Sequence, residues 1–374
     1  METDRKTQFA IQKNRDFRAM KKNAPIIQQE FGFYSLENWK AEGFLKGDED
    51  LKEIFGFDGR TMLALEGLGW CEASFCPAFP EKLLEDRGEY ELVQDFAGRH
   101  VLYFKGRRDG FMPEYVDHPV KDWDTWERDV KWRLSPDAEG RFTGMTEHAA
   151  SFSNLIKQHD YMVAQCAIGG YMYLRSLVGP EGILYMVYDE PKLVHDMMKT
   201  WFELADRIIA FHQKYMKLDE LFLAEDICYN HGPLIAPDMI REFLFPYYQQ
   251  LIANIKARQK DKTRHLHIQI DTDGDCRPVI PVYQEIGADY FSPFEVASGC
   301  DVVELRKQYP QILMRGGIDK RILAAGKDAI SREIDRIMPF MKEQGGYIPV
   351  CDHGVPAEVK FEDYLHYRNL MRCF

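Results

Sequence analysis

The sequence predicts an α/β protein whose main body is a single (β/α)8 barrel. From residue 161 onward, short apolar stretches alternate with longer stretches of helical spacing, which is typical of a parallel sheet with helices on both faces. Acidic or histidine residues follow several of the apolar stretches, as expected at the C-terminal rim of a barrel. No glycine-rich phosphate loop follows a strand, although an open doubly wound sheet usually carries one.

Composition and charge exclude several classes of protein. The chain has 374 residues, 45% of them hydrophobic, so it can bury a large core. Its net charge of -12 disfavours binding to nucleic acid. No apolar run approaches the roughly 18 residues of a membrane-spanning helix, and the first residues lack a secretory apolar stretch. We therefore expect a cytoplasmic protein with no membrane partner.

The eight cysteines are scattered without Cys-x-x-Cys pairs, which favours reduced thiols over disulfides. The spacing of Cys71 and Cys76 fits no common zinc pattern, so we expect them to pack rather than to bind metal. We also expect Cys276 and Cys351 to be packing residues.

The first third of the chain is expected to precede and decorate the barrel. We interpret residues 1–55 as an N-terminal arm of short helices and turns, and residues 56–374 as the barrel. The elements expected before residue 161 are a first strand with a long loop at 61–79, a hairpin at 90–105 that turns at Ala97 and Gly98, and a helix at 119–134. We expect Trp123, Trp126 and Trp132 of that helix to lie in the core.

The rest of the chain carries the alternating pattern. The expected strands are 161–168, 221–226, 265–271, 288–295, 312–319 and 346–353. The expected helices are 191–215, 237–258, 278–286, 301–309, 328–344 and 361–371. Pro237 followed by Asp238 is a good helix start.

The stretch 265–271 is the strand on which the candidate site depends, because it leads into a loop of acids. Asp271, Asp273 and Asp275 crowd around Gly274. Three carboxylates so close together repel one another unless water, a cation or a proton-sharing partner relieves them. A solvated turn on an edge strand is the alternative interpretation.

Other strands also end in groups with useful chemistry. These groups are Glu225, Asp226, Asp271, Asp273, Glu295, Asp319, Asp352 and His353. Adjacent acids at a strand end have few structural uses, so we predict that Glu225 or Asp226 acts as a general acid or a further ligand.

The second half of the chain resembles the uroporphyrinogen decarboxylase superfamily. The resemblance covers roughly residues 160 to 374 and rests on the runs EDICYNHGPLIAPDMIREFLFPYY, DTDGDCRPVIPVYQEIGADYFSPFEVASGC, RGGIDKRILAAG and GGYIPVCDHGVPAEVKFEDYLHY. It implies a single distorted TIM barrel with its site at the C-terminal ends of the strands. The superfamily contains heme-pathway decarboxylases and corrinoid-dependent methyltransferases. The Arg-rich segment with which the decarboxylases begin, of the type MRQAGRY, is not found in this chain.

The resemblance also implies a set of metal ligands. The related coenzyme M enzymes hold zinc with a His-x-Cys pair after the corresponding strand and a Cys in the last loop. Asp271 and Asp273 stand at the His-x-Cys positions of this sequence, and His353 stands at the position of the last Cys. Oxygen and imidazole ligands make a harder site than thiolates do, better matched to an oxygen-bearing substrate such as an ether. A metal-free acid/base site is the alternative.

These observations lead to a functional prediction with two rivals. We predict a methyltransferase that moves a methyl group from a methoxylated aromatic substrate to a corrinoid supplied by a partner protein, with zinc as the suspected metal. The rivals are a decarboxylase and a barrel that only binds a ligand. The predicted site comprises His353, Asp226 and Glu225 as catalytic groups, Tyr229, Tyr171, Tyr173, Glu295 and His267 as substrate-binding groups, and Asp271, Asp273 and His353 as metal ligands. His267 is a rival ligand, although a lone histidine on a strand is more often a hydrogen-bonded core residue.

Overall fold

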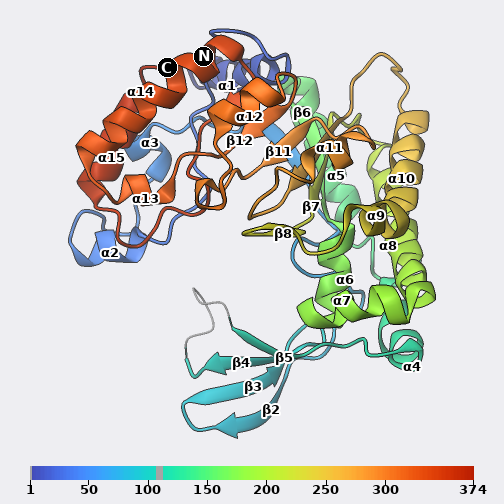
Figure 1. Cartoon of the computed structure of the whole chain (residues 1–374). Helices are drawn as coiled ribbons and strands as arrows, with labels where there is room; N and C mark the ends of the chain where they lie inside the picture. Colours follow the sequence, from blue (N-terminus) through green and yellow to red (C-terminus); the bar gives the residue numbers. More distant parts are fainter. Residues whose placement is uncertain (1, 107–112) are drawn as a thin grey trace.

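The computed structural model describes residues 2–106 and 113–374, and its main body is a curled sheet of seven parallel strands (Figure 1). The strands occur in the order β1-β6-β7-β10-β11-β12-β13. Their bounds are Met62–Leu65 (β1), Met162–Ile168 (β6), Glu220–Ala224 (β7), His267–Asp271 (β10), Tyr290–Ser292 (β11), Leu313–Arg315 (β12) and Tyr347–Ile348 (β13). Every adjacent pair is parallel.

The parallel sheet with crossover helices confirms the predicted α/β architecture. In the described residues β1 and β13 are the edge strands, so the sheet forms a half-barrel. The eighth strand and the closure of the barrel therefore remain predictions.

Helices follow most strands. Those at 191–212, 237–258, 280–284, 302–308, 327–344 and 361–371 lie where the hydrophobic periodicity predicts them, whereas those at 145–159, 170–178, 180–189 and 320–323 were not predicted. Their bounds are Met145–His159 (α5), Gly170–Val178 (α6), Pro180–Asp189 (α7), Pro191–His212 (α8), Pro237–Met239 (α9), Phe245–Arg258 (α10), Ile280–Gln284 (α11), Val302–Gln308 (α12), Lys320–Leu323 (α13), Lys327–Gln344 (α14) and Phe361–Met371 (α15), with short helical turns at Ile240–Leu244 (η3) and Val296–Ser298 (η4). Helices α8 and α10 pack side by side (Figure 1). In the described parts of the chain, no helix has both the length and the apolar character needed to cross a membrane.

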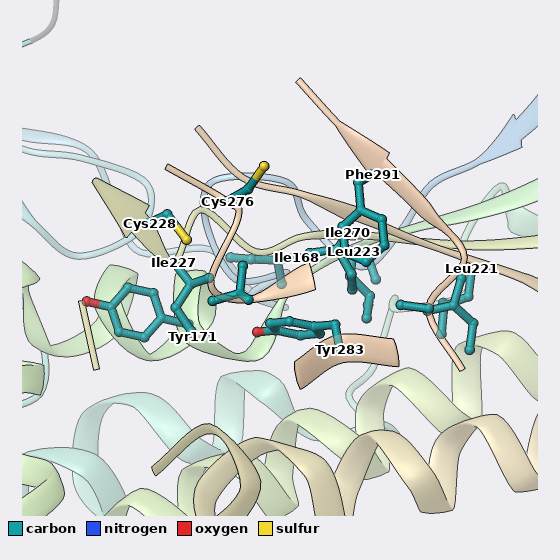
Figure 2. Packing of buried hydrophobic residues seen from close by; sticks show 14 of the residues in the cluster. Ile168, Tyr171, Leu221, Leu223, Ile227, Cys228, Ile270, Cys276, Tyr283 and Phe291 are labelled. Atoms are coloured by element: carbon teal, nitrogen blue, oxygen red, sulfur yellow. The ribbon is translucent and has the colours of Figure 1, made fainter. Parts of the chain in front are cut away.

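The core lies between the sheet and these helices. Figure 2 shows Leu221, Leu223 and Ile270 from neighbouring strands packed in one cluster with the rings of Tyr171 and Tyr283. The strands are buried on both faces, as expected for a parallel sheet under helices. Cys276 and Cys351 are buried, in agreement with the prediction that they are packing residues.

A separate antiparallel sheet follows β1 and is drawn below the main body in Figure 1. Its strands are Lys82–Arg87 (β2), Tyr90–Gln94 (β3), His100–Phe104 (β4) and Glu114–Asp117 (β5). The predicted hairpin turn at Ala97 and Gly98 is confirmed, because the Asp95 carboxylate accepts the N–H groups of Ala97 and Arg99. A small hairpin of Cys228–Tyr229 (β8) and Gly232–Pro233 (β9) follows β7.

The N-terminal segment contains helices Glu2–Arg18 (α1), Leu36–Ala41 (α2) and Leu51–Phe55 (α3). The end of α1 contacts the starts of two strands: Arg18 forms an ion pair with Glu220 at 2.5 Å, and the ring of Phe17 packs on Tyr290. Helix α1 therefore covers the N-terminal ends of the sheet strands, opposite to their C-terminal ends.

The helical segment before α5 is irregular. It consists of α4 (Trp123–Thr125), η1 (Trp126–Val130) and η2 (Lys131–Leu134). Trp126 is fully buried, and its indole N–H donates to Asp196 at 2.7 Å. Trp123 and Trp132 are 37% and 48% exposed, so the prediction that all three tryptophans lie in the core is wrong for these two. The widened η1 turn breaks the regular helical spacing on which that prediction depended.

Candidate active site at the carboxyl ends of the strands

A cavity of about 420 Å³ lies at the C-terminal ends of the strands. Four predicted site residues line it together: Asp226 after β7, Asp271 and Asp273 after β10, and His353 after β13. Its remaining walls come from the N-terminal segment, the loop after β1, helix α6 and the antiparallel sheet. The cavity therefore collects residues from distant parts of the chain.

Asp271 is the most enclosed acid of this group. Its side chain accepts a hydrogen bond from the Ser292 hydroxyl on β11. Burial raises the pKa of Asp271 to about 7, although Ser292 and Arg315 act against the shift. Its backbone carbonyl accepts the N–H groups of Glu225 and Asp226 at 2.8 and 3.0 Å, which ties the end of β10 to the end of β7.

Asp273 and His353 lie next to each other in the cavity lining. The distance from His353 Nε2 to the Asp273 carboxylate is 3.7 Å. Burial raises the pKa of Asp273 to about 6, although the nearby His353 lowers it. The Tyr34 ring stacks on the His353 ring with centroids 5.9 Å apart, which orients the imidazole. Two carboxyl groups whose pKa values are raised toward neutrality, with an imidazole beside them, are suited to proton transfer.

Hydrogen bonds from neighbouring segments hold the loop that carries His353. The Cys351 N–H donates to Glu30 at 2.7 Å, and the Tyr364 hydroxyl donates to the same carboxylate at 2.8 Å. The Asp352 carboxylate accepts the N–H of Val296 at 2.9 Å. These bonds fix the backbone on both sides of Asp352 and so position His353.

Asp226 adopts a strained backbone conformation at the end of β7, with φ of 40°. Non-glycine residues in this region are uncommon and cluster at functional sites. The carboxylate pairs with Arg175 of α6 at 2.5 Å, and both residues line the cavity. The turn of the backbone directs Asp226 into the cavity and separates it from its neighbour Glu225.

Glu225 does not line the cavity, contrary to the prediction that it acts on substrate there. Its carboxylate is fully buried and accepts the N–H of Tyr171 at 2.8 Å and the hydroxyl of Tyr248. Burial raises the pKa of Glu225 to about 7 against these hydrogen bonds. Consecutive residues at a strand end point in different directions, so only one of the two adjacent acids reaches the cavity.

The third acid of the loop, Asp275, is also turned away. Its carboxylate binds the Arg277 side chain at 2.7 Å, and this hydrogen bond lowers the pKa of Asp275. Gly274 has φ of 76°, and a Cβ there would lie 2.6 Å from the Tyr229 carbonyl oxygen. The loop therefore packs tightly on β8, which explains why glycine occupies this turn.

Glu295 supports this loop from outside the cavity lining. It accepts the Gly274 N–H at 2.9 Å and forms an ion pair with Lys320 at 2.8 Å. Burial would raise the pKa of Glu295, but Lys320 and the Gly274 N–H lower it. Its contacts are those of a group that holds the loop of Asp273.

The remaining predicted substrate-binding residues lie elsewhere. Tyr171 and Tyr173 are buried in the core, and Tyr229 is 48% exposed without lining the cavity. His267 begins β10 and binds Asp289 at 2.8 Å, at the N-terminal end of the sheet. These four residues do not line the cavity, so the prediction is wrong for them. The orientation of the helix or strand decides which way each side chain points.

The predicted metal ligands share the cavity but do not form a compact set. Within residues 2–106 and 113–374, the three His, Cys, Asp or Glu side chains with ligand atoms all within 4.8 Å of one another are His265, His267 and Asp289. Asp271, Asp273 and His353 offer suitable donors but do not meet that spacing, since Asp271 is engaged with Ser292. Their placement as it stands does not fit a zinc ion.

Comparison with known proteins identifies the family. The sequence model described as "Uroporphyrinogen decarboxylase (URO-D)" matches residues 121–372, more than half of the chain. The chain belongs to the URO-D family. A uroporphyrinogen decarboxylase from Alcanivorax borkumensis is 23% identical to this URO-D member over 184 residues, and the match covers 46% of each protein. The chain thus matches less than half the length of that relative.

Solved structures overlap with this URO-D member only in part. A methyltransferase from Methanosarcina mazei is 13% identical, with a TM-score of 0.48 over 70% of this chain and 72% of that one. A B12-independent methionine synthase from Shewanella sp. W3-18-1 is 14% identical, with a TM-score of 0.35 over 61% and 64% of the two chains. With TM-scores below 0.5, neither likeness bears on function.

The structure of this URO-D member adds cavity residues that the sequence did not reveal. The indole of Trp70 lies at the cavity and stacks on Phe222 with centroids 4.8 Å apart and planes 16° apart. Arg99 of the antiparallel sheet binds Asp95 and Glu72. Trp70 follows Gly67 and Gly69 in an irregular loop, where no periodic pattern exists to read.

His118 is a second histidine that sequence reasoning missed. It lines the cavity beside Arg99, and burial together with this cation lowers the pKa of His118 to about 4. The imidazole is therefore neutral at physiological pH and can accept or donate one hydrogen bond. Its position directly after an exposed antiparallel strand gave no signal of a role at the rim.

Proposed function

We propose that the chain is a methyltransferase that removes a methyl group from a small methoxylated aromatic compound and passes it to a corrinoid held by a partner protein. The observation that supports this proposal is a cavity in which protonatable carboxyl groups face an aromatic wall. Asp271 and Asp273 supply the carboxyl groups, and Trp70 supplies the exposed ring face.

The charge of the cavity argues against a polycarboxylate substrate such as a porphyrinogen. The acidic groups that line it are Glu72, Asp226, Asp271 and Asp273. The two guanidinium groups that line it, Arg99 and Arg175, already bind carboxylates of the chain. A substrate with several carboxylates needs cations that are free to bind it, and like charges in a cleft repel it.

A neutral aromatic ether suits this environment better. The Trp70 ring is 49% exposed and is held by its stacking on Phe222, so its free face can stack on a substrate ring. Phe31 and Tyr115 are further aromatic residues of the wall. An apolar ring with one polar substituent would satisfy both the aromatic and the acidic parts of the lining.

The chemical task of the protein is to stabilise the oxygen that departs from the methyl group. A phenol is a weak acid, so its anion leaves readily only if a proton or a positive charge reaches it. With pKa values near 7 and 6, Asp271 and Asp273 retain a proton in part of the population at neutral pH and can donate it to that oxygen. His353, beside Asp273, can return the proton afterwards.

Positioning completes the contribution of the chain. Arg175 holds Asp226, and Tyr34 holds the ring of His353. When bound, the corrinoid accepts the methyl group. Keeping the reacting groups oriented supplies a large part of the rate of such bimolecular steps.

The experiment is a methyl-transfer assay with the full chain, reduced cobalamin and a panel of methoxylated aromatics. We expect methylcobalamin and the corresponding phenol to appear in equal amounts. Asp273→Asn should slow the transfer at least tenfold, whereas Asp238→Asn, at an exposed helix start, should not. Absence of methylcobalamin with every compound of the panel would overturn the proposal.

The rival decarboxylase is tested in parallel. Release of carbon dioxide from a porphyrinogen by the same preparation would favour decarboxylation and would contradict our charge argument. That result would also require Arg99 or Arg175 to exchange its internal partner for the substrate.

Zinc at Asp271, Asp273 and His353 stays a prediction on which no step above depends. Elemental analysis of the wild type and of Asp273→Asn, both purified without chelator, measures it by difference. Less than about one-tenth of an equivalent at this site, with activity unaffected by chelator, would leave these residues as proton-handling groups only.

The proposal also includes the closed eight-stranded barrel over residues 56–374, with residues 1–55 as its arm. Backbone bonds between the N-terminal segment and the last loop, from Tyr34 to Val355 and from Val355 to Gly32, are consistent with a strand-like contact near the open edges of the sheet. An experimental structure in which β1 and β13 remain edge strands, with no eighth strand between them, would contradict the prediction of a closed barrel.

A further inference from the structure

A compact histidine and aspartate cluster lies at the end of the sheet opposite the cavity. His267 is the first residue of β10, His265 lies two residues before it, and Asp289 directly precedes β11. His265 Nε2 and His267 Nδ1 lie 2.7 and 2.8 Å from the same oxygen of Asp289. The two imidazole rings are 4.5 Å apart at an interplanar angle of 76°, so both direct a nitrogen to one point.

We propose that His265, His267 and Asp289 bind a divalent transition-metal ion such as zinc, which ties the start of β10 to the start of β11. Two imidazoles and one carboxylate are ligands that zinc accepts, and three protein ligands leave a fourth position for water. Tetrahedral zinc holds its ligand atoms roughly 3.3 to 3.5 Å apart, given bonds of about 2.0 to 2.2 Å. Each of the two nitrogens would need to move away from the Asp289 oxygen by only about half an ångström.

The carboxylate is already oriented for this role. One oxygen of Asp289 accepts the Ile268 N–H at 3.0 Å, which leaves the other oxygen directed at the imidazoles. Hydrogen bonds to a ligating carboxylate are a regular feature of metal sites.

The surroundings of the cluster let a cation reach it and present no unpaired positive charge that would repel the cation. A cavity of about 290 Å³ is lined by His265 and His267, and the His265 side chain is 63% exposed. The two arginines of this cavity, Arg15 and Arg264, each form an ion pair with an aspartate. Their charge is thus compensated, and a hydrated cation can reach the open position.

The location indicates a structural role. Helix α1 covers this end of the strands, and Tyr290, next to Asp289, packs against Phe17 of that helix. Residues at the N-terminal face of such sheets serve stability, whereas catalysis occurs at the other face. The bound ion would stabilise the folded state, and more so as the free ion concentration rises above the Kd, because the unfolded chain has no assembled site.

The test is zinc binding to the metal-free full chain in competition with a chromogenic chelator. We expect His265→Gln and Asp289→Asn to weaken binding at this site at least tenfold. His265 is exposed, so its replacement leaves the packing of the strands intact. The matched control is His148→Gln, at an exposed histidine of α5 outside the cluster, which should leave this affinity unchanged.

Two further measurements separate this site from other sites on the chain. Cobalt(II) in place of zinc should show visible bands of nitrogen and oxygen ligation without thiolate charge transfer, which excludes binding to the cysteines. Saturating zinc should raise the unfolding temperature of the wild type and of His148→Gln by roughly 2 °C or more, but not that of His265→Gln. Equal zinc affinity in wild type and His265→Gln, or an unchanged unfolding temperature at saturation, would show that the cluster is a metal-free hydrogen-bond network.

Discussion

Replacing Glu225 with glutamine should abolish a pH dependence of stability that a single buried proton creates. Glu225 is fully buried, and burial raises its pKa to about 7 from an ordinary value of 4.5. Between these two values the folded state keeps the proton and the unfolded state has lost it. The proton therefore stabilises the fold fully below the unfolded pKa, and this stabilisation is lost as the pH rises through the folded pKa.

The magnitude follows from the two pKa values. At pH 5 the proton on Glu225 contributes about 2.5 kcal/mol to the free energy of unfolding, and at pH 8 it contributes almost nothing. Glu225→Gln keeps an acceptor for the Tyr171 N–H but does not titrate. The variant should therefore lack about 2.5 kcal/mol of the change in stability that the wild type shows between these two pH values.

The assay is urea unfolding of both proteins at intervals from pH 5 to pH 8, followed by tryptophan fluorescence. Other groups that titrate in this range cancel in the difference between wild type and variant. Glu295→Gln is the matched control: the pKa of Glu295 is lowered, so its contribution is present at neutral pH and is lost on acidification. An identical pH dependence in wild type and Glu225→Gln would refute the reasoning and would mean that Glu225 is ionised in the folded protein.

Three other substitutions test the cavity. His353→Ala should reduce methyl transfer about 100-fold while circular dichroism stays unchanged, since the side chain lies at the rim; loss of folded protein would assign His353 a structural role. Trp70→Ala should raise the KM for an aromatic substrate about tenfold, whereas Trp70→Phe should keep it near the wild-type value; equal effects would exclude stacking. Glu30→Ala should lower kcat and destabilise the fold by about 1 to 3 kcal/mol, because it removes the acceptor for Cys351 and Tyr364; a variant with normal kcat would show that this anchor does not position His353.

The alternation of strands and helices was predictable because burial imposes it on the sequence. A parallel strand covered on both faces needs a continuous apolar stretch, and α8 needs an apolar stripe, so both leave a pattern that can be read. The positions of Asp226, Asp271 and Asp273 at the cavity followed from the same logic, since parallel strands end at one edge.

The direction of individual side chains was not predictable. Glu225 and Asp226 are neighbours in sequence, but the left-handed backbone of Asp226 directs one into the core and the other into the cavity. His267 is on the same strand as Asp271, yet four residues of extended chain place it at the opposite end of the sheet. Trp70 and Arg99 reach the cavity through loops and tertiary packing, which no local pattern encodes.

The antiparallel sheet determines which part of the cavity wall a change in sequence can alter. Its strands pair only with one another, and they are encoded by one continuous segment, from Lys82 to Asp117. This segment and the turn after it supply Arg99, Tyr115 and His118 to one wall, while the acids of the opposite wall stand on the strands of the main sheet. An insertion or exchange confined to the segment would reshape the wall that meets the ligand and leave the acids in place. These parts of the two walls therefore lie in separate stretches of the sequence, so one can be altered while the other is kept.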